Sequence, residues 1–412
     1  MSVMDMVFDQ LIFTIKTRPV SLLNYKHTCV FMAASRHHKA DSSFAKAYSS
    51  STPSNSSSRF SYHIAASFIG KDRPFDPSSH VYHFNPYNRV HAPRTRRRSS
   101  RPDSGHDAFF VSRIQDTGSV AFGVADGVGG WVDSGVDPAD FSHGLCDHMA
   151  ASAYAHDAGN SSTRLTARRL MQKGYDAVCD DRSLQGGGST ACVGIAAPDG
   201  TFEVANLGDS GFLQLRLNAV NAYSEPQTHA FNTPFQLSLV PPSIAARMAA
   251  FGGSQLCDLP RDADVSQHYV RHGDILMFAT DGVLDNLFRH DILKIVSRVM
   301  VSTGAWQGTP AGGVRVGDTI DLLTKPSSSG DDNSEPAGKV IKTKPITLQS
   351  LLATEIVAAA KAASINTKVD GPFAKEVQKY YPHDEWRGGK VDDICVVVAV
   401  VSEDLGDARS KL

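Results

Sequence analysis

The sequence predicts an α+β layered sandwich built as one large domain. Two observations support this fold class: short segments rich in β-branched and aromatic residues are bounded by Gly, Asp or Asn, and longer segments with helical periodicity separate groups of them. Because the strands come in clusters with helix pairs between them, a layered arrangement of antiparallel strands is favoured over regular βαβ winding.

The expected elements follow from these patterns in chain order. Strands are expected at residues 108–114, 119–125, 190–197, 202–208, 211–217, 267–272, 274–280 and 393–401. Helices are expected at residues 138–156, where Pro138 opens the helix, and at 163–179, 290–300 and 349–365. Residues 302–347 are rich in Gly, Ser, Pro and charged side chains, and are expected to be a disordered surface insertion.

Residues 1–70 are expected to be a transit peptide or a disordered Ser-rich region. From Met32 to Gly70 the chain is rich in serine, contains several basic residues and has one acidic residue, Asp41, which is typical of an organelle transit peptide. Residues 1–31 fit this composition less well, and translation from Met32 is one alternative. A Ser-rich tail without a targeting role is the other.

The remaining boundaries follow from changes in composition. Residues 71–101 are interpreted as a basic linker, residues 102–402 as the folded domain and residues 403–412 as a C-terminal tail. The linker ends in 94-RTRRRSSR-101. A solvated segment is the preferred interpretation of this run, and a processing site or a phosphate-attracting patch are the alternatives.

Charge and composition exclude several classes of function. The chain has 41 Lys and Arg against 43 Asp and Glu, so no global charge excess favours nucleic-acid binding. Its six cysteines form no CxxC pair, which disfavours a disulfide scaffold and a structural zinc site. The apolar runs are strand-sized, well short of the roughly 20 residues that span a bilayer. We expect a monomer without stable membrane insertion.

Aspartates recur at the ends of apolar strands, three times beside a glycine and once as a pair that stands before a strand. The four stretches are 121-AFGVADGVGGW-131, 206-NLGDSG-211, 277-MFATDGVLDNL-287 and 388-GGKVDDICVVVAV-400. One Asp-Gly pair alone is most simply a turn. Four such sites, however, can supply the converging oxygen ligands that a hard divalent cation requires. Without a Cys/His cluster, Mg²⁺ or Mn²⁺ is favoured over zinc, and metal-assisted hydrolysis is predicted.

These stretches resemble the metal-dependent protein phosphatase family (PPM, or protein phosphatase type 2C), Ser/Thr phosphatases that use two or more Mn²⁺ or Mg²⁺ ions. The matching blocks are 105-GHDAFFV-111, 123-GVADGVGGW-131, 187-GGSTACVGI-195, 205-ANLGDSGF-212, 278-FATDGVLDN-286 and 389-GKVDDICVVVA-399. The resemblance implies a four-layer α/β-β/α sandwich of two mostly antiparallel sheets flanked by helix pairs. It also implies a metal-activated water as the nucleophile.

The resemblance assigns the principal site residues. It implies that Asp126 bridges two metal ions and that the backbone carbonyl of Gly127 binds one of them. Asp281 and Asp392 would complete the carboxylate ligands of the other ion, so Asp126, Asp281 and Asp392 are the candidate catalytic residues. The glycines at 127, 129 and 130 are expected to allow a sharply turned backbone beside the metal.

Further carboxylates match outer positions of the family site. Asp107 would lie near the first ion and bind it through water. Asp209 and Asp285 match positions that can hold a third, weaker ion, so two or three ions are expected. Asp393 is expected to be a neighbour and not a ligand.

The sequence departs from the family pattern at three positions. Val128 stands where many members have a histidine thought to protonate the leaving oxygen, so either another group or a metal-bound water donates that proton, or turnover is low. His106 replaces a glutamate, and is expected to be a surface or supporting residue more often than a ligand. Pro102 replaces a phosphate-gripping arginine, for which Arg101 and Arg113 are the candidate substitutes.

Several residues have structural interpretations that we prefer. Trp131 and Phe141 are expected to pack in the core. Cys192 and Cys395 are expected to be buried, unreactive thiols. The segment 229-HAFNTPFQLS-238 is either a substrate-docking loop or a structural loop.

Three blocks resemble the mitochondrial branch of the family, the protein phosphatase 2C homolog 7 type: 123-GVADGVGGW-131, 229-HAFNTPFQLS-238 and 388-GGKVDDI-394. That resemblance implies a mitochondrial matrix location, phosphorylated mitochondrial proteins as partners and a link to ubiquinone (coenzyme Q) biosynthesis. A catalytically weak metal-binding regulatory protein (a pseudophosphatase) is one alternative, motivated by Val128 and His106. A small-phosphoester hydrolase is the other.

Overall fold

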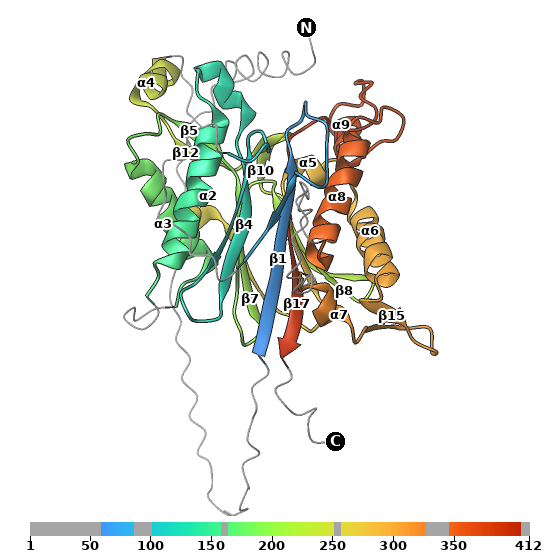
Figure 1. The fold of residues 1–412 in the computed structure, drawn as a ribbon. Helices are drawn as coiled ribbons and strands as arrows, with labels where there is room; N and C mark the ends of the chain where they lie inside the picture. The colour runs from blue at the N-terminus through green and yellow to red at the C-terminus, as the bar shows by residue number, and fades with distance from the viewer. Residues whose placement is uncertain (1–58, 86–100, 158–163, 251–256, 327–345, 405–412) are drawn as a thin grey trace, which may run out of the picture.

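Two antiparallel sheets stack face to face, and helices cover both outer faces (Figure 1). The computed structural model describes residues 59–85, 101–157, 164–250, 257–326 and 346–404. The predicted four-layer α+β sandwich is therefore confirmed.

The first sheet has six strands, and the second has five. In spatial order the first sheet consists of β2 (Val81–His83), β1 (Arg59–Ile69), β17 (Ile394–Asp404), β14 (Ile275–Ala279), β8 (Gly211–Arg216) and β9 (Ala219–Tyr223). The second consists of β13 (Asp264–Tyr269), β7 (Thr201–Leu207), β6 (Ala191–Ala196), β4 (Val120–Asp126) and β3 (Asp107–Arg113). Every predicted strand lies in one of these sheets.

Three small two-stranded sheets lie outside the sandwich. They are β10 (Thr228–Ala230) with β11 (Thr233–Pro234), β5 (Gly187–Ser189) with β12 (Leu237–Leu239), and β15 (Trp306–Gly308) with β16 (Val314–Val316).

The four predicted helices form the outer layers. Helices α2 (Pro138–Tyr154) and α3 (Ala167–Asp180) cover the second sheet, and α6 (Arg289–Ser302) and α8 (Leu348–Ser364) cover the first (Figure 1). Pro138 opens α2 as predicted, and the Asp137 carboxylate caps it by accepting from the Ala139 amide. The shorter helices are α4 (Pro242–Ala250), α5 (Asp281–Leu284), α7 (Ile320–Leu323) and α9 (Pro372–Tyr380).

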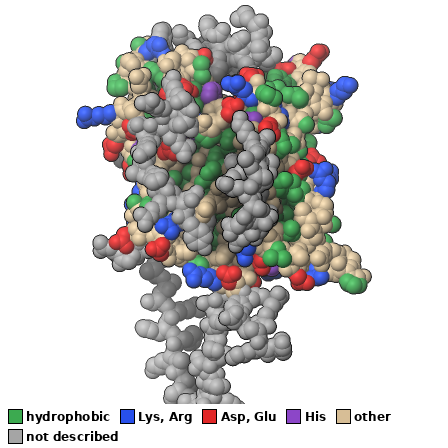
Figure 2. Space-filling model, viewed as in Figure 1, with side chains coloured by type: hydrophobic (Ala, Val, Ile, Leu, Met, Phe, Trp, Pro, Cys, Tyr) green, Lys and Arg blue, Asp and Glu red, His purple; other side chains and the backbone are tan. Residues whose placement is uncertain are grey.

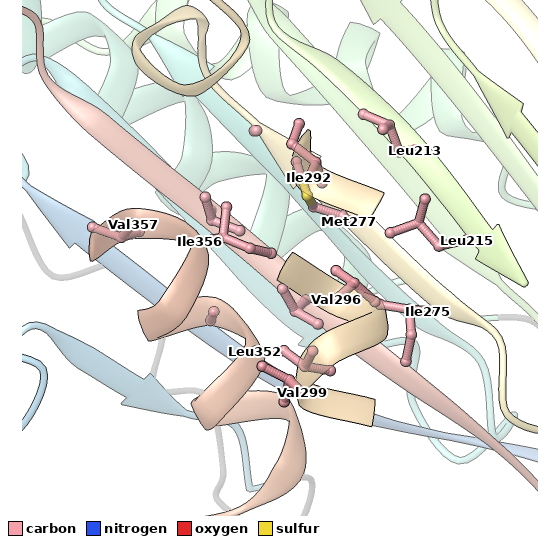
Figure 3. Packing of buried hydrophobic residues seen from close by; sticks show 14 of the residues in the cluster. Leu213, Leu215, Ile275, Met277, Ile292, Val296, Val299, Leu352, Ile356 and Val357 are labelled. Carbon is pink, nitrogen blue, oxygen red and sulfur yellow. The ribbon is translucent and has the colours of Figure 1, made fainter. Parts of the chain in front are cut away.

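The middle strands are apolar on both faces because both faces are buried. Alternate residues of β17, from Ile394 to Val400, face α6 and α8, and the residues between them face the other sheet. Figure 3 shows the helix side, where Val296 of α6 and Ile356 of α8 pack over Met277 of β14. Continuous apolar runs such as 394-ICVVVAVV-401 follow from this double burial.

Four phenylalanines fill the space between the two sheets. Phe122, Phe202, Phe212 and Phe278 are buried and pack in stacked and edge-to-face pairs, with ring centroids 5.0–6.1 Å apart. Because these rings come from β4, β7, β8 and β14, they fix the separation of the sheets.

The predicted start of the domain is wrong. Strand β1 pairs with β17 along all 11 of its residues, from Arg59 to Ile69, and β2 extends the same sheet. The segment that we assigned to the 1–70 region therefore supplies a central strand, and the 71–101 linker contains another strand. The serines around it obscure the alternation of Tyr62, Ile64, Ala66 and Phe68, which face the inter-sheet core. Residues 1–58 lie outside the described residues.

The predicted disorder of residues 302–347 is also wrong for its first part. Trp306 is fully buried, and its indole Nε1 donates to the Gly273 carbonyl at 3.1 Å. Ile320 in α7 is buried against the same cluster as α6. Residues 327–345 lie outside the described residues. At the C-terminus β17 continues to Asp404, so the tail begins later than residue 403.

Basic and acidic side chains are interspersed over the face shown in Figure 2. Within the described ranges, none of the helices has the length and apolar character needed to cross a bilayer.

Candidate active site

The predicted aspartates lie where strand ends from the two sheets meet. Asp107 opens β3 and Asp126 closes β4, and the two residues face each other directly in the strand register. Asp281 opens α5, one residue beyond Thr280 at the end of β14, and Asp392 lies two residues before β17. The sandwich therefore brings two carboxylates from each sheet to the same end of the molecule, where α5 lies in Figure 1.

A threonine joins the two sheets at this end. The Thr280 hydroxyl donates to Asp107 Oδ2 at 2.7 Å, and it accepts from the Cys395 amide at 3.0 Å. This contact fixes the orientation of the Asp107 carboxylate. The sequence analysis missed Thr280, although it precedes Asp281 in the quoted stretch.

The main chain around Asp126 is held from several sides. The Asp126 amide donates to the Thr190 hydroxyl at 3.0 Å, and the Ser189 hydroxyl donates to the Asp126 carbonyl at 2.8 Å. The Gly127 amide donates to the His106 carbonyl at 3.1 Å. These bonds engage the main chain of Asp126 and leave its carboxylate to interact with other groups.

Gly127 is needed because other backbone comes close, and not because of an unusual turn. A Cβ there would lie 2.8 Å from the Pro138 carbonyl oxygen and 2.9 Å from the His106 carbonyl oxygen. Gly127 and Gly129 do not have positive φ angles, and a Cβ on Gly129 would meet nothing within 4 Å. The chain does turn here, from the end of β4 into a short 3-10 helix at Gly129–Ser134, but Gly127 is required by the close approach of other backbone and not by a left-handed conformation.

The carboxylates form one electrostatic cluster. Burial, followed by repulsion from Asp281 and other neighbouring carboxylates, raises the pKa of Asp126 well above its usual range. Burial and the neighbouring Asp393 do the same to the pKa of Asp107. Burial, with Asp281 and Asp285 nearby, raises the pKa of Asp209. The site thus gathers more negative charge than the protein compensates.

Two of the outer carboxylates, Asp209 and Asp285, are poorly compensated by the protein itself. Asp209 Oδ1 is buried and lacks a hydrogen-bond partner among the described residues. Burial raises the pKa of Asp285 to about 7, against the opposing effect of Lys390. A buried carboxylate oxygen without a donor is costly unless a cation binds it.

Lys390 is the main site residue that sequence reasoning missed. Its ammonium Nζ lies 2.6 Å from Asp281 Oδ2, 2.7 Å from Asp285 Oδ2 and 3.0 Å from Asp392 Oδ2. Burial alone would lower the pKa of Lys390, but the three carboxylates outweigh it and raise the pKa above its usual range. Burial would likewise raise the pKa of Asp281, and Lys390 turns the net shift downward.

The donor set fits a hard divalent cation. Six neighbouring aspartates supply only oxygen donors, three of them pair with the Lys390 ammonium, and one buried oxygen, Asp209 Oδ1, has no partner among the described residues. In the described part of the chain, no three His, Cys, Asp or Glu side chains already converge as a formed metal site. The Lys390 ammonium lies between three of the candidate ligands, Asp281, Asp285 and Asp392, and these carboxylates are turned toward it.

Asp393 has the supporting position that was predicted for it. Its Oδ1 accepts from the Lys71 amide and its Oδ2 from the His106 amide, both at 2.8 Å. The His106 ring Nδ1 lies 3.8 Å from the same carboxylate. Asp393 therefore holds the backbone just after β1 and just before β3, and both of its oxygens are engaged in these bonds.

The two arginines proposed as phosphate-binding substitutes have other partners. Arg113 ends β3, at the opposite end of the strand from Asp107, where it lies 3.6 Å from Asp116 and over the Tyr154 ring. That prediction is wrong for Arg113. Arg101 pairs with Asp137 and Asp140 at the start of α2, and its side chain is 14% exposed. Its charge is thus already compensated.

The preferred structural interpretations are confirmed for the core residues. Trp131 and Phe141 are buried, and the Trp131 indole donates to Gln236 Oε1 at 3.0 Å. Cys192 and Cys395 are buried within strands, and burial raises the pKa of both thiols.

The segment 229–238 has a structural role in this arrangement. It forms β11 and parts of β10 and β12, and β12 pairs with β5 next to Gly127. Gln236 links it to Trp131 in the glycine-rich turn. A docking role for the same segment stays a prediction.

Curated relatives of the chain are protein phosphatases. The chain is 28% identical to the yeast (Saccharomyces cerevisiae) "Protein phosphatase 2C homolog 7, mitochondrial", over 92% of this chain and 93% of the relative. It is 32% identical to "Protein phosphatase PTC7 homolog fig" of Drosophila grimshawi, over 72% of this chain and 79% of that protein. No family model matches the chain.

A solved structure agrees with the fold. The X-ray structure of the photosystem II phosphatase PBCP superposes with a TM-score of 0.52 at 21% identity, covering 82% of this chain and 98% of that one. The solved structure thus supports the fold, and the curated relatives show the family. The chain belongs to the protein phosphatase 2C (PPM) family, among its PTC7 homologues, and is a protein phosphatase of that type.

Proposed function

We propose that the chain is a Mn²⁺- or Mg²⁺-dependent protein Ser/Thr phosphatase of the mitochondrial matrix. The single observation that supports this most is the cluster of aspartates from both sheets, which brings more carboxylates together than the one ammonium of Lys390 pairs with. Buried carboxylates at the converging ends of strands are an arrangement suited to holding divalent ions.

The residues have distinct parts in this proposal. Asp126 and the Gly127 carbonyl would hold one ion, and Asp126, Asp281 and Asp392 the other. When bound, the two ions would supply Lewis acidity and a water nucleophile for attack on a phosphoserine or phosphothreonine. Asp107, oriented by Thr280, would support the first ion from the opposite strand.

The proton for the leaving oxygen has to come from elsewhere than position 128. Val128 has no acidic proton in its side chain, and its amide donates to the Gly188 carbonyl at 3.0 Å. Neither Cys192 nor Cys395 can act as nucleophile from its buried position. The chain also lacks a CxxxxxR phosphatase loop at any cysteine. The chemistry therefore depends on the aspartates.

The activity test compares two aspartates of opposite exposure. The EDTA-treated full chain should release phosphate from a phosphothreonine or phosphoserine peptide only after Mn²⁺ or Mg²⁺ is added. Asp126→Asn should remove this activity, whereas Asp116→Asn should not, because the Asp116 side chain is 95% exposed and far from the cluster. Phosphatase activity that persists in EDTA would contradict the proposed metal dependence.

The same assay separates the two alternatives. A small-phosphoester hydrolase would act on p-nitrophenyl phosphate without any preference for phosphopeptides. A pseudophosphatase would bind Mn²⁺ without measurable turnover, and Asp126→Asn would rescue a null strain.

The mitochondrial location is supported by the name of one relative and by composition. The yeast relative is named mitochondrial, and residues 32–58 have the Ser-rich, acid-poor character of a transit peptide. A fusion of residues 1–58 to a fluorescent protein should enter the matrix, and a cytosolic signal would contradict this. A link to ubiquinone biosynthesis predicts that null cells regain normal ubiquinone with the wild-type chain and not with Asp126→Asn.

A further inference from the structure

Lys390 is the least expected feature of the site, since it places a positive charge among candidate metal ligands. Its three carboxylate partners come from two segments: Asp281 and Asp285 flank α5, and Asp392 precedes β17. The Lys390 side chain is only 7% exposed. The ammonium is therefore an internal counter-ion of Asp281, Asp285 and Asp392.

The position of Lys390 is built by its neighbours. The Asn286 side chain binds the Lys390 main chain twice: its Nδ2 donates to the Lys390 carbonyl at 2.8 Å, and its Oδ1 accepts from the Lys390 amide at 2.9 Å. The ammonium also lies 5.0 Å from the centre of the Phe373 ring, within cation-π range. The backbone is thus fixed, and the flexible side chain is the part that can move.

A divalent ion and this ammonium need the same oxygens. An ion held by Asp281 and Asp392 would lie within a few Å of the observed Nζ position, where like charges repel strongly at the low dielectric of a buried site. A third ion held by Asp209 and Asp285 would compete with the ammonium as well, because Asp285 already binds Lys390. The ammonium in its present position and a divalent ion at the same carboxylates cannot both be fully accommodated.

We propose that Lys390 is a tethered cation that occupies the Asp281, Asp285 and Asp392 side of the site, gives way to the second divalent ion there, and keeps a third ion from binding at Asp209 and Asp285. This inference rests on the proposed metal dependence and adds to it the control of how many ions bind. In the metal-free protein the same ammonium stabilises the fold, because it compensates carboxylates that would otherwise be buried without a partner.

The experiment counts metal ions and does not depend on turnover. Lys390→Met keeps roughly the length of the side chain and removes its charge. The variant protein is expressed and purified in the presence of Mn²⁺, so that the metal compensates the charge of the aspartates during folding. Mn²⁺ per chain is then measured by equilibrium dialysis and by electron paramagnetic resonance. The matched control is Lys294→Met, which removes an exposed lysine that pairs with Asp291 on α6.

Lys390→Met is expected to bind one more Mn²⁺ than the wild type, or to bind its weakest ion about tenfold more tightly or better. Lys294→Met should match the wild type in both respects. Equal stoichiometry and affinity in Lys390→Met and the wild type would overturn the inference. A wild type that binds no Mn²⁺ at all would instead overturn the proposed function.

A second measurement on the wild type covers the case in which Lys390→Met does not fold. Labelling of lysines with an amine-reactive ester is followed by mass spectrometry with and without Mn²⁺. Displacement by the second ion predicts that labelling of Lys390 rises when Mn²⁺ is added, while labelling of Lys294 stays constant. Unchanged labelling of Lys390 under saturating Mn²⁺ would contradict the displacement.

Discussion

Single residues at this site show which kinds of information a sequence carries. Asp126, Asp209 and Asp281 could be predicted because each stands beside a glycine at the end of an apolar run, and Asp392 because it precedes such a run. Lys390 could not, because a lysine beside two glycines is normally read as part of an exposed loop. The role of Lys390 depends on which strand ends the fold brings together.

Gly127 and Gly129 provide a test within one turn. Gly127→Ala should lower metal-dependent phosphatase activity at least about tenfold, because its methyl group would press on the Pro138 and His106 carbonyls and shift Asp126. Gly129→Ala meets open space and should retain wild-type activity. Phosphate release at saturating Mn²⁺ measures both, and equal effects of the two substitutions would contradict the packing argument.

At the scale of elements, the strands and helices with strong periodicity were predictable. Helix α2 begins at Pro138 as expected, and β17 was evident from its continuous apolar run. Strand β1 was missed because its small and polar residues resemble the Ser-rich segment before it. The hairpin at Trp306 was missed because one buried indole holds a segment whose composition is polar.

Strand β1 should be indispensable for folding. A chain that begins at residue 70 lacks the partner of β17 along its whole length and exposes the inter-sheet face that Ile64 and Phe68 cover. It should be insoluble or lack a cooperative thermal transition, whereas a chain that begins at residue 55 should unfold cooperatively. Circular dichroism melting curves decide this, and a stable fold without β1 would refute the topology.

Trp306 gives a second test at this scale. Trp306→Ala should lower the free energy of unfolding by about 3–5 kcal/mol, as expected for removal of a buried aromatic side chain. Urea denaturation provides the measurement. A disordered segment at 302–326 would instead predict no change in stability.

At the scale of the whole molecule, the fold and the metal site depend on each other. The two sheets meet at the aspartates, so repulsion among these groups opposes the closing of the sandwich at that end. Thr280 and Lys390 offset part of this repulsion, Thr280 by its bond to Asp107 and Lys390 by its pairs with Asp281 and Asp285, all between segments that are distant in the chain.

Divalent ions should therefore stabilise the whole domain. Mn²⁺ at about 100 times its dissociation constant should add about 2.7 kcal/mol to the free energy of unfolding. Thermal melts in Mn²⁺ and in EDTA should differ for the wild type and for Asp116→Asn, and should nearly coincide for Asp281→Asn. A melting temperature of the wild type that does not change when Mn²⁺ is added would contradict the assignment of the aspartates as a metal site.

The most direct test of the central claim is an anomalous diffraction map of crystals grown with Mn²⁺, recorded at the manganese absorption edge. We predict two peaks, both in contact with the Asp126 carboxylate, one also with the Gly127 carbonyl and the other with Asp281 and Asp392. A map without peaks at Asp126, from crystals of protein that is active with Mn²⁺, would contradict the assignment of these aspartates as the metal site.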